Sequence, residues 1–166
     1  MCYTENLQKR GVKEWQKEKE LQVHFIDVGQ GDATLIFQDE HAMLIDGGDN
    51  LYGWQIVDYL NYLEIEHLDY VIGTHPDSDH IGGLDTVLEN ISCDRVLMPD
   101  VENDTATYES VIEVLKEQRL ERISPKPGEE YTLGTAVFTI LAPNDSYDNT
   151  NDNSIAIRQT ARFRCI

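Results

Sequence analysis

The chain has 166 residues, enough for one domain that buries a substantial hydrophobic core. Hydrophobic residues make up 40% of it and charged residues 27%, a balance that excludes a chain disordered throughout. The formal net charge is −18, and residues 21–94 contain fifteen acidic side chains without one lysine or arginine. So negative a surface repels phosphate backbones and disfavours tight nucleic-acid binding through basic side chains. The carboxylates fit either a solvated surface or a metal site.

No apolar run approaches the roughly 18 residues that a membrane helix needs. The polar residues 1–20 also lack the apolar centre of a secretory signal. The three cysteines, Cys2, Cys93 and Cys165, form no Cys-x-x-Cys pair, so neither a disulfide framework nor a cysteine zinc site is indicated. We therefore expect no membrane segment in this chain and, by default, a cytoplasmic location.

The first part of the chain predicts an extension followed by short strands. We expect a charged extension over residues 1–20, either helical or frayed, and one domain over residues 21–166. After Leu21, short apolar runs broken by glycine and aspartate predict three strands with tight links, which is typical of an antiparallel meander. These strands span residues 21–28, 33–38 and 42–46.

The spacing of the apolar residues then changes to that of a helix over residues 54–63, with Trp54, Val57 and Leu60 on one face. The dense apolar run at residues 69–74 predicts a strand buried on both faces. The remaining elements alternate in type: a helix over 80–90, a strand at 95–98, a helix over 107–120, shorter strands within 121–141, a polar loop over 143–153 and a strand from Ser154. This alternation indicates a mixed α/β domain (α+β in some schemes).

Four candidate metal ligands, His75, Asp77, Asp79 and His80, lie within six residues directly after the strand at 69–74. Open α/β sheets usually bind ligands at this carboxyl end of a strand. Imidazole nitrogens and carboxylate oxygens are ligands that suit zinc or manganese. In a tight loop, the side chains at positions 75, 77 and 79 can point to one side. His80, next to Asp79, then points to an adjacent position, so the loop can bind two neighbouring metal ions.

A structural alternative exists for the same residues. The string Pro76-Asp77-Ser78-Asp79 is also ordinary chemistry for a turn and a helix N-cap. Any one of these residues alone would more often have a structural role. The presence of all four donors after a buried strand favours the metal site.

Two further strings point to the same centre. Residues 28–33 (VGQGDA) form a turn that carries Gln30 and Asp32, although alone this string predicts only a hairpin. Asp46 ends an apolar strand, and its carboxylate can accept a ring N–H from a histidine ligand and orient the imidazole. We therefore expect Gln30, Asp32 and Asp46 to line the site or to orient its ligands.

The order of the strings VGQGD, LIDGG and THPDSDHIGG, followed by Asn153-Ser154 before a final strand, resembles the metallo-β-lactamase superfamily. Within it, the chain looks most like the hydrolase domain of ComEC-type competence proteins. The resemblance covers residues 21–160. THPDSDHIGG is highly specific, and the other two strings are specific in combination with it. The resemblance implies a four-layer αββα sandwich with a metal site at one edge of its two sheets.

The resemblance also implies roles for particular residues. His75, Asp77, Asp79 and His80 match the first ligand motif, with Asp77 where most members have histidine, a trait that the ComEC-type branch shares. Members hydrolyse through a metal-bound hydroxide, because the ion lowers the pKa of its water to about 7. Asp79 is then both ligand and proton acceptor. The implied cofactor is Zn²⁺, with Mn²⁺ or another divalent metal as alternatives, and the implied substrates are phosphodiesters, including DNA.

The chain departs from the superfamily after His80, because no later histidine follows. Relatives continue to a metal-bridging aspartate and further histidine ligands. Residues 158–166 contain three arginines and no acid, unlike the preceding domain. We therefore expect only the N-terminal part of the sandwich, with the coding frame lost or cut near residue 158. A second copy could cover its open sheet and give a homodimer.

Three functions stay open from the sequence. The first is a metal-dependent hydrolase that acts on phosphodiesters. The second is a catalytically inactive remnant or binding module that keeps only the first ligand motif, and the third is an acidic binder of divalent ions. Asp148, Thr150 and Asp152 lack the glycine and glutamate of a calcium loop and are a weaker candidate site.

Overall fold

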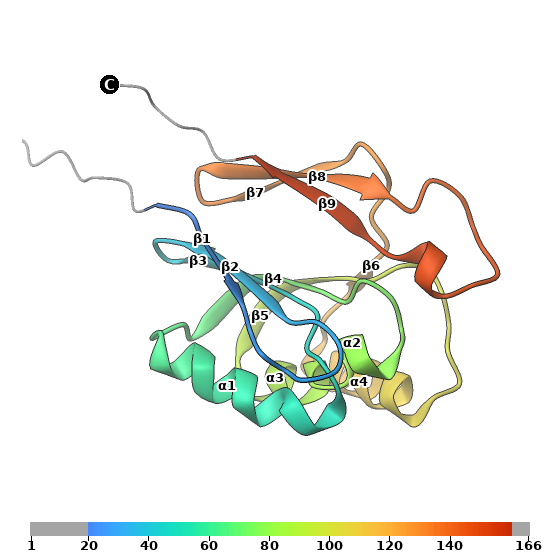
Figure 1. Cartoon of the computed structure of the whole chain (residues 1–166), viewed down its shortest axis with the longest axis horizontal. Coiled ribbons are helices and arrows are strands. Elements are labelled where there is room, and N and C mark those ends of the chain that lie inside the picture. Colours follow the sequence, from blue (N-terminus) through green and yellow to red (C-terminus); the bar gives the residue numbers. More distant parts are fainter. Residues whose placement is uncertain (1–19, 161–166) are drawn as a thin grey trace, which may run out of the picture.

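The computed structural model describes residues 20–160, so the extension predicted over residues 1–20 lies outside the described residues apart from Glu20. These residues form a six-stranded sheet of order β1-β2-β3-β4-β5-β6 and a three-stranded sheet of order β7-β8-β9 (Figure 1). The strands are β1 Gln22–Phe25, β2 Thr34–Gln38, β3 His41–Ile45, β4 His67–Ile72, β5 Ser92–Leu97, β6 Arg122–Ile123, β7 Glu130–Leu133, β8 Ala136–Ala142 and β9 Ala156–Thr160. The helices are η1 Asn50–Tyr52, α1 Gly53–Tyr62, α2 Ser78–Ile81, α3 Leu84–Asn90, α4 Ala106–Gln118 and η2 Asn151–Asn153.

The predicted meander is confirmed, since β1, β2 and β3 pair antiparallel in chain order. From β3 onward the pairing is parallel through β4, β5 and β6. Each parallel step needs a crossover, and α1, then α2 with α3, then α4 supply these crossovers. The carboxyl ends of β3 and β4 therefore meet at one edge of the sheet, where the predicted site residues follow.

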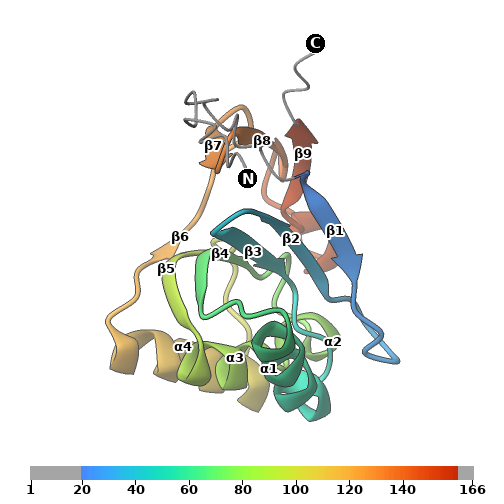
Figure 2. The same cartoon turned by 90° about the vertical axis from the view of Figure 1, so that its left-hand side faces the viewer.

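All of the helices from α1 to α4 cover one face of the six-stranded sheet (Figure 2). The core between them is aliphatic, and β4 contributes side chains to both faces of the sheet, as predicted for the run at residues 69–74. The fully buried members of this core include Leu35, Leu44, Ile56, Leu60, Leu68, Ile81, Leu84 and Val111.

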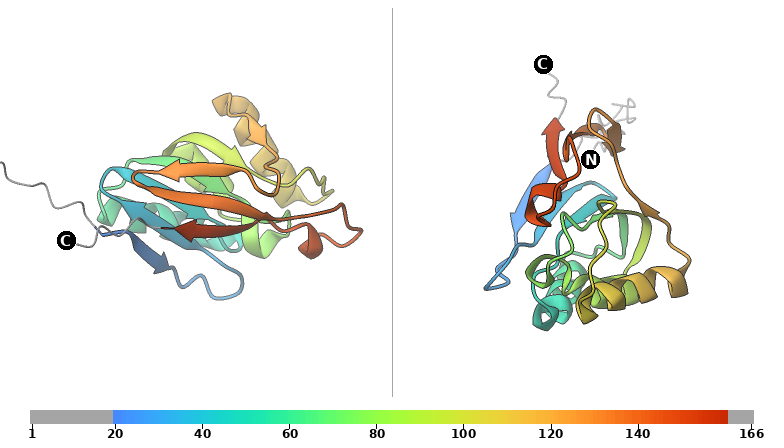
Figure 3. Two further views of the ribbon diagram at one scale, coloured as in Figure 1. Left: turned by 90° about the horizontal axis from the view of Figure 1, so that it is seen from above. Right: turned by 90° about the vertical axis from the view of Figure 1, so that its right-hand side faces the viewer.

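A second core lies between the two sheets. Phe138 of β8 is fully buried there, 5.1 Å from the ring of Tyr70 in an edge-on contact and 5.2 Å from the ring of Tyr131 in a stacked one. The layers are thus helices, large sheet and small sheet, and the left view of Figure 3 looks down on the small sheet lying over the large one. They supply three layers of the predicted αββα sandwich, and within residues 20–160 no helix covers the outer face of the small sheet.

Two details differ from the sequence prediction. Trp54 was expected on the inner face of α1, but its side chain is 61% exposed and Ile56 takes the inner position beside Val57 and Leu60. The expected single helix over residues 80–90 is two helices, α2 and α3, joined at Gly82-Gly83. A Cβ at Gly82 would lie 2.3 Å from the backbone nitrogen of Asn50, so the chain passes η1 more closely there than a regular helix with side chains allows. Among residues 20–160, no helix is long and apolar enough to cross a membrane.

The packing of the small sheet on the large one can be tested through Phe138. We expect Phe138→Ala to lower the free energy of unfolding by about 3–5 kcal/mol, because a fully buried aromatic ring is lost from the inter-sheet core. Trp54→Ala is the matched control and should change it by less than about 0.5 kcal/mol, since that ring is largely exposed. Urea denaturation followed by circular dichroism measures both; equal losses would contradict this packing.

Candidate metal centre

The centre is organised by Asp46, the residue that follows β3. Its carboxylate is buried and accepts hydrogen bonds from the Thr74 backbone N–H at 2.7 Å, the Thr74 hydroxyl at 2.7 Å and His80 Nδ1 at 2.9 Å. The backbone of Asp46 is left-handed, with a φ of 59°, a conformation that aspartate tolerates better than most residues. Three donors satisfy a carboxylate that burial would otherwise penalise heavily. This carboxylate therefore connects the ends of β3 and β4 to α2.

The hydrogen bonds to Asp46 also fix the tautomer of His75. The Thr74 hydroxyl gives its only proton to Asp46, so its oxygen, 3.1 Å from His75 Nδ1, can only accept from that ring. Burial, and next the neighbouring His80, hold the pKa of His75 below its ordinary value, which favours the neutral ring. With the proton on Nδ1, Nε2 carries a bare lone pair. This Nε2 is buried and has no hydrogen-bond partner.

Asp77 faces the unpartnered nitrogen of His75. Its Oδ2 lies 3.6 Å from His75 Nε2. Asp77 occupies the N-cap position of α2, yet its side chain makes no capping hydrogen bond. The structural alternative to a metal site rested on that capping role, so its absence at Asp77 removes much of the support for it. Two atoms that both carry lone pairs then face each other with no proton between them.

His80 presents a second imidazole beside the first, with the two ring centroids 4.0 Å apart. Its hydrogen bond to Asp46 is the largest cause of a pKa raised above the ordinary histidine value. Because Asp46 can only accept, Nδ1 of His80 carries the proton, and Nε2 is the nitrogen left for a ligand. Asp46 thus sets the tautomer of His80 directly and that of His75 through Thr74.

Asp79 and the 27–33 loop form the other side of the centre. Gln30 Nε2 lies 3.5 Å from Asp79 Oδ2, and the Asp32 backbone N–H donates to the Asp79 carbonyl at 3.3 Å. The charges of Asp79 and Asp32 also contribute to raising the pKa of His80. The side chain of Asp32 is exposed, so it lies at the rim rather than inside.

Glycines hold these loops together by close backbone contacts. Gly47 N–H donates to the His80 carbonyl at 2.6 Å, and Gly48 N–H donates to the Asp32 carbonyl at 2.9 Å. A Cβ at Gly31 would lie 1.8 Å from the Asp79 carbonyl oxygen, and the φ of Gly31 is 97°. No other residue fits at position 31 without moving α2.

The separation of two donors in this centre fits a divalent ion. Two ligands of one tetrahedral zinc ion, each about 2.1 Å from it, lie about 3.4 Å apart. The 3.6 Å between His75 Nε2 and Asp77 Oδ2 is close to that separation. An orphaned, deprotonated imidazole nitrogen beside a carboxylate fits a cation, whereas a bare lone pair against an anion is unfavourable without one. Within residues 20–160, however, no three His, Cys, Asp or Glu side chains already converge as a metal site.

All seven residues predicted from the sequence therefore lie in one neighbourhood, at the carboxyl ends of β3 and β4, although their roles as ligands stay a prediction. Sequence reasoning missed two contributors. The Thr74 hydroxyl links the Asp46 carboxylate to His75 through hydrogen bonds. Its position between a buried strand and a histidine is the sequence signal that could have indicated this role. Asn151, 3.4 Å from Asp77 Oδ2 through its Nδ2, comes from a run of Asn and Asp in which no single residue stands out.

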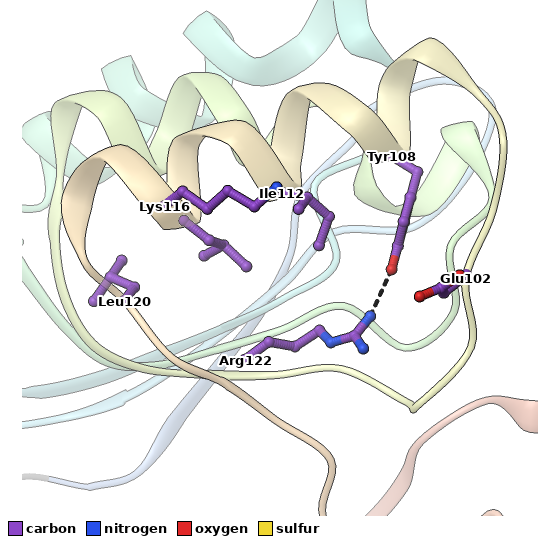
Figure 4. Close-up of a pocket in the computed structure, with 7 residues that line it drawn as sticks. Glu102, Tyr108, Ile112, Lys116, Leu120 and Arg122 are labelled. Carbon is purple, nitrogen blue, oxygen red and sulfur yellow. Dashed lines mark hydrogen bonds between the residues drawn. The ribbon is translucent and has the colours of Figure 1, made fainter.

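A separate pocket of about 340 Å³ lies along α4 (Figure 4). The hydroxyl of Tyr108 accepts a hydrogen bond from Arg122 across it at 2.5 Å. The pocket contains no histidine, and β6 lies two strands away from β4 in the sheet. It is lined by Glu102, Tyr108, Ile112, Leu115, Lys116, Leu120 and Arg122. The pocket is thus distinct from the candidate metal centre.

Solved structures with the same fold share the layered arrangement. A subclass B3 metallo-beta-lactamase with an active-site glutamic acid superposes with a TM-score of 0.61 at 17% identity, covering 88% of this chain and 57% of that one. ETHE1 from Myxococcus xanthus superposes with a TM-score of 0.56 at 20% identity, covering 84% of this chain and 53% of that one. At such low identity these similarities establish the fold alone.

Residues 26–144 match the family model of the metallo-beta-lactamase superfamily, and the chain belongs to that superfamily. Its curated relatives support the ComEC-type branch. It is 25% identical to ComE operon protein 3 of Bacillus subtilis over 151 residues, 80% of this chain and 20% of the relative. It is 35% identical to Recombination protein 2 of Haemophilus influenzae over 91 residues, 52% of this chain and 12% of the relative. The chain thus spans a fifth or less of the length of these relatives.

The contact between the 27–33 loop and Asp79 can be tested at Gly31. Gly31→Ala should lower the free energy of unfolding by about 1–3 kcal/mol more than Gly128→Ala, because only at Gly31 would the new Cβ meet backbone. Both glycines have a positive φ, 97° and 90°, and nothing lies within 4 Å of a Cβ at Gly128. The control thus isolates the contact from backbone strain. Chemical denaturation measures the difference, and equal losses would count against the contact.

Proposed function

We propose that this chain is a hydrolase domain whose His75, Asp77, Asp79 and His80 hold a divalent metal ion. One observation carries the proposal: the buried, unpartnered Nε2 of His75 faces the Asp77 carboxylate at 3.6 Å. A buried polar atom without a partner is rare and calls for a specific explanation. A cation between the two side chains would satisfy both of them.

The chemistry of the donors supports zinc or manganese as the ion. Two imidazoles suit zinc, and two carboxylates extend the range toward the oxygen-preferring manganese. Such an ion supplies Lewis-acid polarisation of the scissile bond and acidifies the attacking water. The outer contacts are already present, since Asp46 orients His80 and Thr74 orients His75. Buried partners of this kind fix the tautomer and direction of histidine ligands.

Within this proposal Asp79 has a second role as proton acceptor. It lies on the first turn of α2, and Gln30 holds one of its oxygens at 3.5 Å. Asp79 is only half-buried, so its carboxylate is not fully enclosed. Proton transfer needs a carboxylate within hydrogen-bond reach of the attacking water, and in this proposal Asp79 supplies it.

The proposed substrates are phosphodiesters, including DNA. The ComEC-type relatives, one of them named a recombination protein, support this class. The net charge of −18 makes a cation necessary for such a substrate, because the acidic surface would repel a phosphodiester in its absence. The metal would then serve both as catalyst and as the positive charge that the surface lacks.

A non-catalytic binding module is the second candidate function. It is favoured by the observation that no three potential ligands already converge within the described part of the chain. Such a module would bind an ion through His75 and Asp77 without turning substrate over. The two candidates differ in turnover rather than in metal binding.

The test is hydrolysis of bis-p-nitrophenyl phosphate and of single-stranded DNA by the whole chain, with Mn²⁺ or Zn²⁺ added after treatment with a chelator. We expect metal-dependent turnover that His75→Ala and Asp79→Ala each reduce to background. His67→Ala is the matched control, because His67 is an exposed histidine at the amino end of β4 and should leave turnover unchanged. Turnover without metal, or equal rates in His75→Ala and His67→Ala, would contradict the proposal; metal binding without turnover would support the binding module.

A further inference from the structure

The polar loop before β9 is folded around one buried side chain, Asn153. Its side-chain amide is 3% exposed and makes three hydrogen bonds within the loop. Its Oδ1 accepts from the Tyr147 N–H at 3.0 Å, and its Nδ2 donates to the carbonyls of Tyr147 at 2.7 Å and Asn149 at 2.8 Å. Both N–H groups of the amide and one of the two lone pairs on its oxygen are used, so residues 147–153 form a closed unit rather than a loose connection.

This unit holds the backbone of Asn151 at both polar groups. The Asn151 N–H donates to Asn149 Oδ1 at 2.8 Å. The Asn151 carbonyl accepts from the Ser154 backbone N–H at 3.1 Å and from the Ser154 hydroxyl at 2.6 Å. With both groups held, the Cα–Cβ bond of Asn151 has a fixed direction.

The loop and the residue that follows Ser154 make two hydrogen bonds to the candidate metal centre. The Ile155 N–H donates to the Thr74 carbonyl at 2.9 Å, next to the residue that carries the first imidazole. Asn151 Nδ2 donates to Asp77 Oδ2 at 3.4 Å, the same oxygen that faces His75 Nε2. The loop and α2 lie on the same side of the molecule, as Figure 1 shows at the carboxyl end of β4.

We infer that residues 147–153 form a wall of the metal centre, and that Asn153 and Asn151 are positioning residues that set the Asp77 carboxylate. Asp77 has no capping bond to orient it, and its rotation is opposed by the Asn151 amide alone among the side chains that donate to it in the described residues. Asn153 acts through Asn151, because its three hydrogen bonds give the loop its shape. This inference rests on the proposed metal site and adds to it the element that aims one ligand.

The test measures Mn²⁺ affinity of the whole chain by calorimetry, alongside amide hydrogen exchange at Tyr147 without metal. Asn153→Ala should weaken binding by up to the about 10-fold expected for Asn151→Ala, because it acts through that side chain, and should speed exchange at Tyr147. Asn151→Ala should weaken binding by about 10-fold, since its contact is long, and Asn151→Gln should recover part of the loss. Asn144→Ala, an exposed asparagine earlier in the same segment, is the control and should change neither quantity.

The outcomes separate this inference from the proposed function. Wild-type affinity in Asn151→Ala, or in Asn153→Ala with faster exchange at Tyr147, would overturn the positioning role while leaving the metal site standing. Binding that follows the expected order in a protein without turnover would support the positioning role and count against hydrolysis. A wild-type chain that binds no Mn²⁺ would overturn both.

Discussion

The structure around the candidate site depends on one buried carboxylate. Asp46 collects three hydrogen bonds at the junction of β3, β4 and α2, and only a residue with two acceptor oxygens can do so at a left-handed backbone position. Through these bonds it decides where the protons of both imidazoles lie. Asp46 therefore has two roles. Its hydrogen bonds join β3, β4 and α2, and they also leave Nε2 of both histidines without a proton and able to bind a ligand.

The negative charge around the two histidines is a second constraint on the site. The two histidines lie among Asp46, Asp77 and Asp79, in a chain that has no lysine or arginine from residue 21 to residue 94. Carboxylates gathered without counter-charges are costly, and the protein has no cationic side chain nearby in sequence to neutralise them. A divalent ion would neutralise the cluster. The acidic composition and the local geometry thus favour the same occupant for independent reasons.

The spacing of apolar residues predicted the helices and strands well where the same residues pack into the core. Within the run at residues 69–74, residues 70–73 are buried as expected, because a two-sided core leaves little freedom. The pattern failed at Trp54, where a neighbouring isoleucine offered a better inward position. It also missed the break at Gly82-Gly83 and the contact of Asn151 with Asp77, since both arise from segments that meet only after folding, 32 and 74 residues apart in the chain. The local sequence carries no information on such long-range contacts.

The proposed divalent ion lies between His75 and Asp77. Anomalous diffraction from crystals of the whole chain grown with ZnCl₂ would locate it. We expect an anomalous peak about 2.1 Å from His75 Nε2 that also contacts an Asp77 oxygen. Zinc bound only at surface carboxylates, with His75 Nε2 hydrogen-bonded to water or protein instead, would contradict it.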